Sequence, residues 1–270
     1  NWKLSNPDDQ PNRFESDDFL VMGSMCEERL AEIGKTAQFL MVRSKDDGLT
    51  WTKPENMTRK FKQEDWILFA PSPQQGIALN DGTLVWPVQG RDAKDQHFST
   101  IMVSRDHGAN WTVGSASAVG NTECQAVALD DGSIMLNCRS ERPTKFRSVY
   151  VTRDLGKTWQ PHASHRKALI EPNCNGSTYR FNYVEDGKRK HMLLFANPHS
   201  QQGRTHHTVQ VSFDNGKTWP AKYKLLLDEG GGRGYPSISR IDQRHFGIVY
   251  EGSQADLVFE SIALDELLRK

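Results

Sequence analysis

Short runs of apolar residues recur along the chain, and each is bounded by residues that favour turns. The runs lie at residues 39–42, 83–86, 133–136, 149–151, 191–195 and 246–250, and each is typical of a short β-strand. Acidic or Asn residues followed by Gly, at positions 80–82, 130–132 and 185–187, adjoin such runs as hairpin turns do. We therefore predict an all-β fold, with short helices only within residues 25–33 and 263–269.

One eight-residue phrase occurs four times. It reads Ser/Thr-x-Asp-x-Gly-x-Thr/Asn-Trp and begins at residues 44, 104, 152 and 212, so successive copies are 60, 48 and 60 residues apart. Its Asp can accept hydrogen bonds from the backbone of its own turn, and its Gly supplies the positive φ of a tight hairpin. The closing Trp can cover the end of a sheet while its indole N–H finds a partner. Such a repeat indicates architecture rather than a functional site.

The repeat also predicts how the strands are grouped. Each unit of about 50 to 60 residues holds about four short strands and two tight turns, which is the content of one β-propeller blade. A β-sandwich would give similar strands but no reason for a recurring Asp-Gly-Trp turn. We therefore predict a β-propeller.

Composition and charge exclude several classes of protein. The 270 residues include 34 Lys and Arg and 34 Asp and Glu, so the chain lacks the net positive charge of a nucleic-acid-binding protein. No apolar run reaches the ~18 residues of a membrane span, and the mean hydropathy is −0.67. Four widely spaced cysteines without a CxxC pair do not form a disulfide scaffold or a structural zinc site. We expect a soluble globular protein.

Four such turns on a propeller resemble the Asp boxes of the sialidase (neuraminidase) superfamily. Further segments, in order along the chain, resemble the bacterial exo-α-sialidases, from about residue 38 to the C-terminus. These segments are residues 121–126, 135–139, 166–172, 193–198, 203–204, 225–230, 234–235 and 248–251. The resemblance implies an Asp-box β-propeller of the six-bladed sialidase type, with about five blades in this chain, and a retaining glycoside hydrolase activity on terminal sialic acids.

The resemblance assigns roles to five residues. Tyr235 falls at the position of the family's nucleophilic tyrosine, and Glu123 at that of the glutamate that takes the tyrosine proton. Arg139 and Arg204 match the second and third of three arginines that hold the substrate carboxylate. Glu251 matches the glutamate that orients the first arginine.

These residue types suit a substrate whose anomeric carbon carries a carboxylate. A neutral phenol avoids the repulsion that a carboxylate nucleophile would meet, and sialidases depart from the two-carboxylate rule in this way. A phenol with its ordinary pKa near 10 needs a base beside it to attack at neutral pH. Planar guanidinium groups offer paired donors to a carboxylate. The scheme requires no metal or organic cofactor, and we expect the adjacent His206 and His207 not to bind a metal.

The resemblance is incomplete at the start of the chain. The family's first arginine lies in an Arg-Ile-Pro phrase that this sequence lacks, and Arg13 is the only early candidate. No early aspartate matches the family's acid/base residue; those present are Asp8, Asp9, Asp17 and Asp18. We expect residues 1–270 to form a single propeller catalytic domain that is incomplete at its N-terminus.

Other functions stay open from the sequence. A propeller without the acid and one arginine could bind sialosides without cleaving them, and a third possibility is an interaction propeller for an unrelated ligand. A retained Tyr–Glu pair favours the hydrolase, because a binding module needs neither nucleophile nor base. We expect sialylated glycans as partners, a missing N-terminal segment of the same protein, an extracytoplasmic location, and buried thiols at Cys124 and Cys138.

Overall fold

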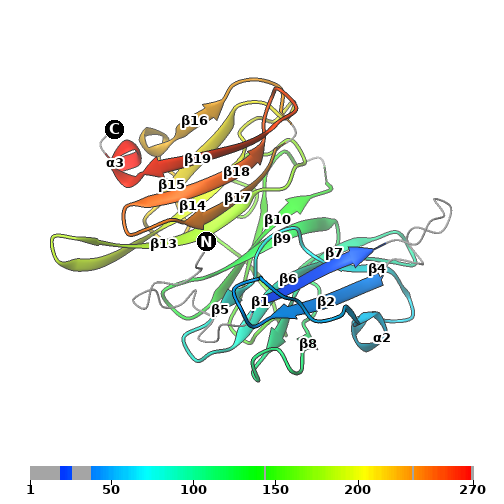
Figure 1. The fold of residues 1–270 in the computed structure, drawn as a ribbon. Helices are drawn as coiled ribbons and strands as arrows, with labels where there is room; N and C mark the ends of the chain where they lie inside the picture. The colour runs from blue at the N-terminus through cyan, green and yellow to red at the C-terminus, as the bar shows by residue number, and fades with distance from the viewer. Residues whose placement is uncertain (1–18, 26–37, 143, 233, 269–270) are drawn as a thin grey trace. The chain divides into compact units, whose positions relative to one another are not determined.

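The computed structural model describes residues 19–25, 38–142, 144–232 and 234–268. In this part of the chain the strands form five antiparallel sheets, each built from strands consecutive in the sequence (Figure 1). The chain divides into two compact units, which are residues 1–124 with 154–158 and residues 125–153 with 159–270. The predicted all-β fold is therefore confirmed, and each sheet has the antiparallel meander of a propeller blade.

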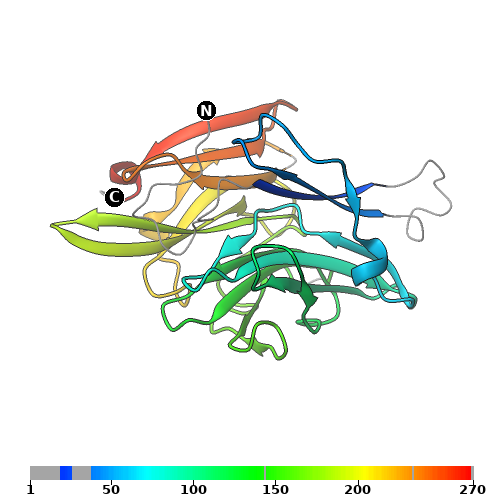
Figure 2. The same ribbon diagram turned by 60° about the horizontal axis from the view of Figure 1, so that its bottom comes forward.

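The first unit holds two sheets and a short helix, drawn from blue through cyan to green in Figure 2. One sheet contains β1 (Phe19–Met25), β2 (Gln38–Ser44) and β3 (Glu55–Asn56). The other contains β4 (Trp66–Pro71), β5 (Ile77–Ala78), β6 (Leu84–Asp92), β7 (His97–Ser104) and β8 (Thr112–Val113). Helix α2 (Thr58–Phe61) follows β3, and its Thr58 hydroxyl accepts a hydrogen bond from the Phe39 N–H at 2.7 Å.

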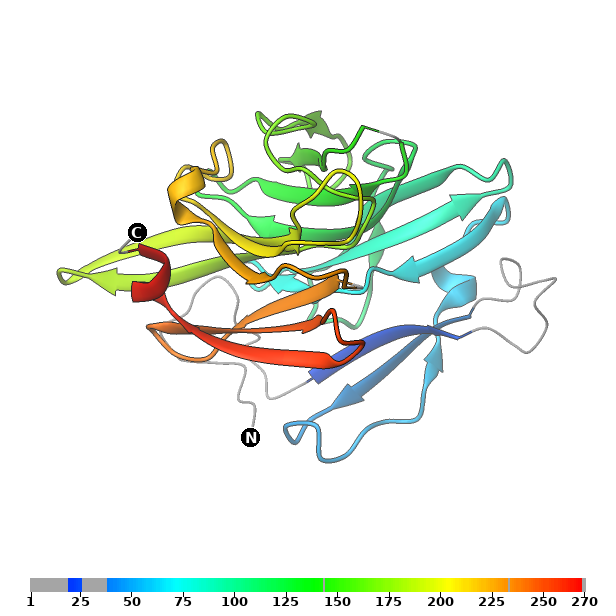
Figure 3. The ribbon, with the colours of Figure 1, turned by 90° about the horizontal axis from the view of Figure 1, so that it is seen from above.

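The second unit contains the remaining sheets, drawn from green to red in Figure 3. Strand β9 (Asn121–Ala128) enters it from the first unit and continues into β10 (Ile134–Ser140), β11 (Ser148–Thr152) and β12 (Gln160–Pro161). The next sheet contains β13 (Ser177–Glu185), β14 (Lys188–Pro198), β15 (His207–Ser212) and β16 (Leu225–Asp228), with the 3-10 helix η2 (Ala221–Tyr223) between its last two strands. The last contains β17 (Gly234–Arg240), β18 (His245–Glu251) and β19 (Leu257–Ala263), followed by α3 (Leu264–Leu268).

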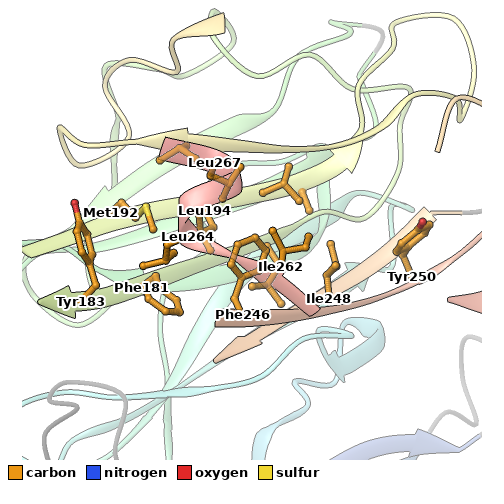
Figure 4. Close-up of a cluster of buried hydrophobic side chains, with 14 residues drawn as sticks. Phe181, Tyr183, Met192, Leu194, Phe246, Ile248, Tyr250, Ile262, Leu264 and Leu267 are labelled. Carbon is orange, nitrogen blue, oxygen red and sulfur yellow. The ribbon is translucent and has the colours of Figure 1, made fainter. Parts of the chain in front are cut away.

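A buried apolar cluster joins the last two sheets of the second unit (Figure 4). Phe181 of β13 and Leu194 of β14 pack with Phe246 and Ile248 of β18, and each of these four side chains is fully buried. Apolar residues two positions apart on a strand share one face, which is why Phe246 and Ile248 both reach this cluster. Burial of each such side chain stabilises the fold by about 1.5–3 kcal/mol. The cluster therefore fixes the final sheet, including β17, against β13 and β14.

The four repeated turns each connect the last two strands of a sheet. In the second copy, Asp106 Oδ1 accepts hydrogen bonds from the Ser104 hydroxyl and the Asn110 N–H, both at 2.8 Å. The Trp111 indole donates to the Gly108 carbonyl at 3.0 Å. Gly108 has φ +83°, and the residue before it also has a positive φ. The predicted hydrogen bonds of the Asp and the Trp and the predicted positive φ of the Gly are therefore confirmed in this copy, whereas the covering of a sheet end by the Trp stays a prediction.

The predicted strands are present, and most extend beyond their apolar runs. The helix expected within residues 263–269 is α3, Leu264–Leu268. The helix expected within residues 25–33 is wrong at Met25, which ends β1, and the rest of that segment lies outside the described residues. The prediction of one domain over residues 1–270 stays a prediction.

Candidate functional site

Arg139 lies at the end of β10, after the fully buried run Ile134–Cys138. Its side chain is 17% exposed, and its Nε donates to the side-chain oxygen of Asn173 at 2.6 Å. Its Nη1 donates to the hydroxyl of Tyr235 at 3.3 Å. Glu141 adds an ion pair, with 3.4 Å between Oε1 and the Arg139 Nε. The guanidinium is therefore held next to the proposed nucleophile.

Tyr235 lies at the start of β17, where the backbone departs from a regular strand. The pairing of β17 with β18 shifts register between Gly234 and Ser237, so one extra residue is accommodated there. Tyr235 has φ +51°, a conformation that side chains other than Gly rarely adopt. Such strain is found mainly where function requires a particular side-chain direction.

Gly234 allows this turn because it lacks a side chain. Its φ is +91°, and an added Cβ would lie 2.8 Å from the Cys174 sulfur and 3.1 Å from the Pro198 Cγ. The backbone before Tyr235 therefore packs directly on the segment after β12 and on the end of β14. This close packing fixes the position of the backbone from which the Tyr235 side chain extends.

Arg204 lies in the loop between β14 and β15 and is half-buried. Its Nη2 donates to the Asn173 carbonyl at 3.4 Å, and its guanidinium carbon lies 5.7 Å from the centre of the Tyr235 ring. Its own carbonyl accepts the Gly232 N–H at 2.9 Å, which ties this loop to the segment that leads into Tyr235. Two of the predicted arginines therefore lie beside the predicted nucleophile.

Glu251 lies at the end of β18 and pairs through its backbone register with Gly234. It is therefore adjacent to the strand position that precedes Tyr235. The resemblance pairs Glu251 with the first of the family's three arginines. That arginine is not identified, because Arg13 lies outside the described residues. The early aspartates Asp8, Asp9, Asp17 and Asp18 also lie outside them.

Glu123 lies on β9, half-buried, in the part of that strand that belongs to the first unit. Its neighbour Cys124 is anchored there by a hydrogen bond from its N–H to the Ser72 hydroxyl at 2.7 Å. Tyr235 belongs to the second unit, and the pairing of Glu123 with Tyr235 stays a prediction.

The ion pair between Arg147 and Glu171 is buried and adjoins the site. Arg147 is fully buried, and its Nη1 donates to Glu171 Oε2 at 2.8 Å and to the Cys174 carbonyl at 2.8 Å. The other Glu171 oxygen accepts the Ser140 N–H at 2.8 Å, directly after Arg139. Burial raises the pKa of Glu171, while Arg147 and the Ser140 N–H oppose that rise by binding the ionised carboxylate.

The sequence predicted no role at this site for Asn173, Arg147 or Glu171. Glu171 lies within segment 166–172, which resembles the bacterial sialidases, and Asn173 follows that segment closely, so the segment itself was the available signal. Nothing local to Arg147 marks it as buried, because its partners lie 10 to 27 positions away along the chain.

The remaining sequence predictions can be placed on the fold. Cys124 and Cys138 are buried free thiols, as predicted. His206 is exposed, whereas His207 is buried and stacks on Tyr250 with ring centres 4.4 Å apart. Among the described residues, no group of three or more His, Cys, Asp and Glu side chains is arranged to hold a metal ion. Within the same residues, no helix is long and apolar enough to cross a membrane.

The chemical properties of Arg139, Arg204 and Tyr235 indicate what this site can bind. Two guanidinium groups lie beside one phenol, and both are partly buried. Guanidinium groups bind carboxylates through paired, charge-assisted hydrogen bonds, which strengthen in a partly buried position. The site can therefore bind an anionic group directly beside a hydroxyl that is able to act as a nucleophile.

The sequence matches the model of the BNR repeat-like domain over residues 20–249. The fold and the match together define the class: this is a β-propeller domain of the BNR repeat-like kind. The chain belongs to the BNR repeat-like family and is a member of its bacterial sialidase branch.

Named relatives and solved structures agree with this assignment. A sialidase of Bacteroides fragilis is 38% identical over 238 residues, covering 88% of this chain and 44% of the relative. A sialidase of Micromonospora viridifaciens is 30% identical over 214 residues, covering 77% and 32%. The Hadza microbial sialidase Hz136 superimposes with a TM-score of 0.87 and 36% identity, covering 94% of this chain and 52% of that one.

A more distant structure shares the fold. The Trypanosoma rangeli sialidase in complex with sialic acid superimposes with a TM-score of 0.73 at 21% identity, covering 93% of this chain and 43% of that one. This chain spans about half or less of the length of the relatives that it matches.

Proposed function

We propose that this protein is a retaining exo-α-sialidase that hydrolyses terminal sialic acids from glycoconjugates, with Tyr235 as its nucleophile. The observation that carries the proposal is the convergence of Arg139 and Arg204 on Tyr235, at 3.3 Å from its hydroxyl and 5.7 Å from its ring centre respectively. Similarity to proteins named sialidases supports the reaction class. In this proposal Arg139 and Arg204 bind the substrate carboxylate, and Tyr235 carries out the nucleophilic attack.

In the first step, Arg139 and Arg204 bind the carboxylate of the sialic acid and so place its anomeric carbon near Tyr235. The Tyr235 oxygen forms a bond to that carbon as the bond from the carbon to the departing sugar oxygen breaks. Glu123 takes the phenol proton, and an acid elsewhere in the protein protonates the departing oxygen. In the second step, the conjugate base of that acid takes a proton from water as the water oxygen bonds to the anomeric carbon and the bond to Tyr235 breaks. Glu123 returns its proton to the Tyr235 oxygen, so the phenol is restored and the configuration is retained.

The bound carboxylate explains why a tyrosine is a suitable nucleophile here. The anomeric carbon carries this negative group, so an ionised Asp or Glu attacking it would be repelled, whereas a phenol brings no charge until its proton leaves. The two guanidinium groups also lie where negative charge develops on the phenol oxygen, and they stabilise it by attraction. We place the substrates among sialylated glycans and, because such glycans are displayed outside cells, the protein in an extracytoplasmic compartment.

The test is release of the aglycone from an aryl α-sialoside by the 270-residue chain and by its Tyr235→Phe variant. Phe retains the ring that Arg204 contacts and differs only by the hydroxyl, so the fold should survive. We expect turnover to fall by at least about 10³-fold, because removal of a covalent nucleophile removes the path itself. Tyr223→Phe, in η2, serves as the matched control and should leave turnover unchanged.

Two results would count against the proposal. Turnover that survives in Tyr235→Phe would exclude Tyr235 as the nucleophile. Binding of sialic acid without turnover in the wild-type chain would instead identify a sialoside-binding propeller.

A further inference from the structure

The two arginines of the site are linked by a single residue that the resemblance does not mention. Asn173 accepts the Arg139 Nε–H through its side-chain oxygen at 2.6 Å and the Arg204 Nη2–H through its backbone carbonyl at 3.4 Å. Its side-chain nitrogen donates to Glu141 Oε2 at 3.4 Å. The direction of the amide is therefore determined, because an arginine can only donate and a carboxylate accepts.

The backbone of Asn173 is held firmly on both sides. Two residues before it, Glu171 accepts the Ser140 N–H and pairs with the buried Arg147. One residue after it, the Cys174 carbonyl accepts Arg147 Nη1 at 2.8 Å. Asn173 itself has φ +59°, which Asn tolerates better than most residues because its short polar side chain can hydrogen-bond locally.

The contact to Asn173 determines how Arg139 can bind a carboxylate. A guanidinium can offer two parallel N–H groups either from the side that contains Nε or from the end that carries Nη1 and Nη2. Asn173 takes the Nε–H at 2.6 Å, and Glu141 Oε1 lies 3.4 Å from the same nitrogen, so a bidentate carboxylate approaches the Nη1–Nη2 end. That end is the one that lies toward Tyr235, since Nη1 is 3.3 Å from the Tyr235 hydroxyl.

We propose that Asn173 is a positioning residue, which turns the Nη1–Nη2 end of Arg139 toward Tyr235 and fixes the spacing between Arg139 and Arg204. This inference rests on the proposed function, because it assigns the purpose of that spacing to the carboxylate of a sialic acid. Asn173 does not touch the reacting atoms in this scheme. It acts through the two guanidinium groups, so its loss should weaken substrate binding more than it slows the chemical step.

The experiment compares the wild-type chain with Asn173→Gly and Asn173→Asp. Gly keeps the positive φ and the backbone carbonyl but removes the side-chain acceptor. Asp keeps an acceptor for the Arg139 Nε–H, although it loses the donor to Glu141 and its charge repels both Glu141 and an incoming carboxylate. Asn215→Gly is the matched control, because Asn215 also has a positive φ, +58°, and its side chain binds Asp130 instead.

The first readout is independent of activity. The Arg139 Nε–H signal in a nitrogen-15 NMR spectrum, assigned by its loss in Arg139→Lys, should exchange slowly with solvent in the wild-type chain. We expect the exchange to accelerate at least about tenfold in Asn173→Gly and to stay slow in Asn173→Asp and Asn215→Gly. Unchanged exchange in Asn173→Gly would overturn the proposal, whatever the activity.

The second readout is the affinity for substrate. We expect KM for the aryl α-sialoside and Kd for N-acetylneuraminic acid to rise about 10- to 100-fold in Asn173→Gly, the range for a hydrogen bond to a charged group, with a smaller change in kcat. Faster exchange with unchanged KM and Kd would also overturn the proposal.

The two proposals fail in different ways. The hydrolase fails if the wild-type chain shows no turnover or if Tyr235→Phe keeps it. A rise in Kd with faster exchange in Asn173→Gly would still support the positioning role in that case.

Discussion

Replacing Glu171 by Gln should destabilise the second unit by about 3–5 kcal/mol, the range for removing one partner of a buried ion pair. Glu171 is 1% exposed and Arg147 is fully buried, so water cannot replace the lost carboxylate. Arg147 would retain the Asn137 side-chain oxygen at 2.8 Å and the Cys174 carbonyl at 2.8 Å. These acceptors are neutral and leave the buried positive charge uncompensated.

Urea denaturation, followed by far-UV circular dichroism and by tryptophan fluorescence, measures this loss. Trp219 lies in the second unit with its ring centre 6.1 Å from that of Phe195, over which Arg147 also packs, so its fluorescence is sensitive to this region. Glu185→Gln is the control in the same unit. Its pair with Lys190 is about half exposed, and such pairs contribute about 0–1 kcal/mol.

A double-mutant cycle separates the pair from its surroundings. Arg147→Met alone leaves a buried carboxylate without its partner, whereas the double variant with Glu171→Gln removes both charges. We expect the double variant to lose less stability than the sum of the single variants. Additive effects, or a loss below about 1 kcal/mol in Glu171→Gln, would refute the assignment of a strongly coupled buried pair.

Two further predictions follow from the same unit. Gly234→Ala should reduce stability by about 1–3 kcal/mol and reduce sialidase turnover, since the new Cβ would lie 2.8 Å from Cys174 at a φ of +91°; wild-type denaturation and turnover in this variant would contradict the close packing. Burial lowers the pKa of His207 to about 4, so the unfolded chain binds a proton there below about pH 6.5 while the folded protein does not. Stability should therefore fall as the pH decreases from about 6.5 to 4, and denaturation curves of His207→Gln should show a smaller fall over that interval.

The repeated turns could be predicted from the sequence because all their interactions are local. In each of the first, second and fourth copies, the Asp binds residues within four positions of itself, and the Trp indole reaches a carbonyl three positions back. Eight residues therefore contain everything that the turn requires. The positive φ before each Gly was not predicted, because the residue at that position varies among Asp, His, Leu and Asn.

The candidate site likewise combines features that could be predicted from the sequence with features that could not. The resemblance to the bacterial sialidases singled out Tyr235, Arg139 and Arg204, and in the structure both arginines lie beside Tyr235. The helix expected at Met25 was wrong, since an isolated short segment has little intrinsic preference and Met25 pairs with Gln38 in β1 and β2.

The sequence by itself determined the architecture of the turns, because their hydrogen bonds are local, and the repeated spacing predicted the class of fold. The residue types at the candidate site followed from the resemblance to the bacterial sialidases. Only the tertiary structure decided that Asn173 connects Arg139 with Arg204, across 34 and 31 positions of chain. It also decided that Arg147 is a buried partner of Glu171, 24 positions away, rather than a solvated side chain. Contacts of this kind depend on which strand ends meet when the sheets pack, and no local pattern of residues specifies that.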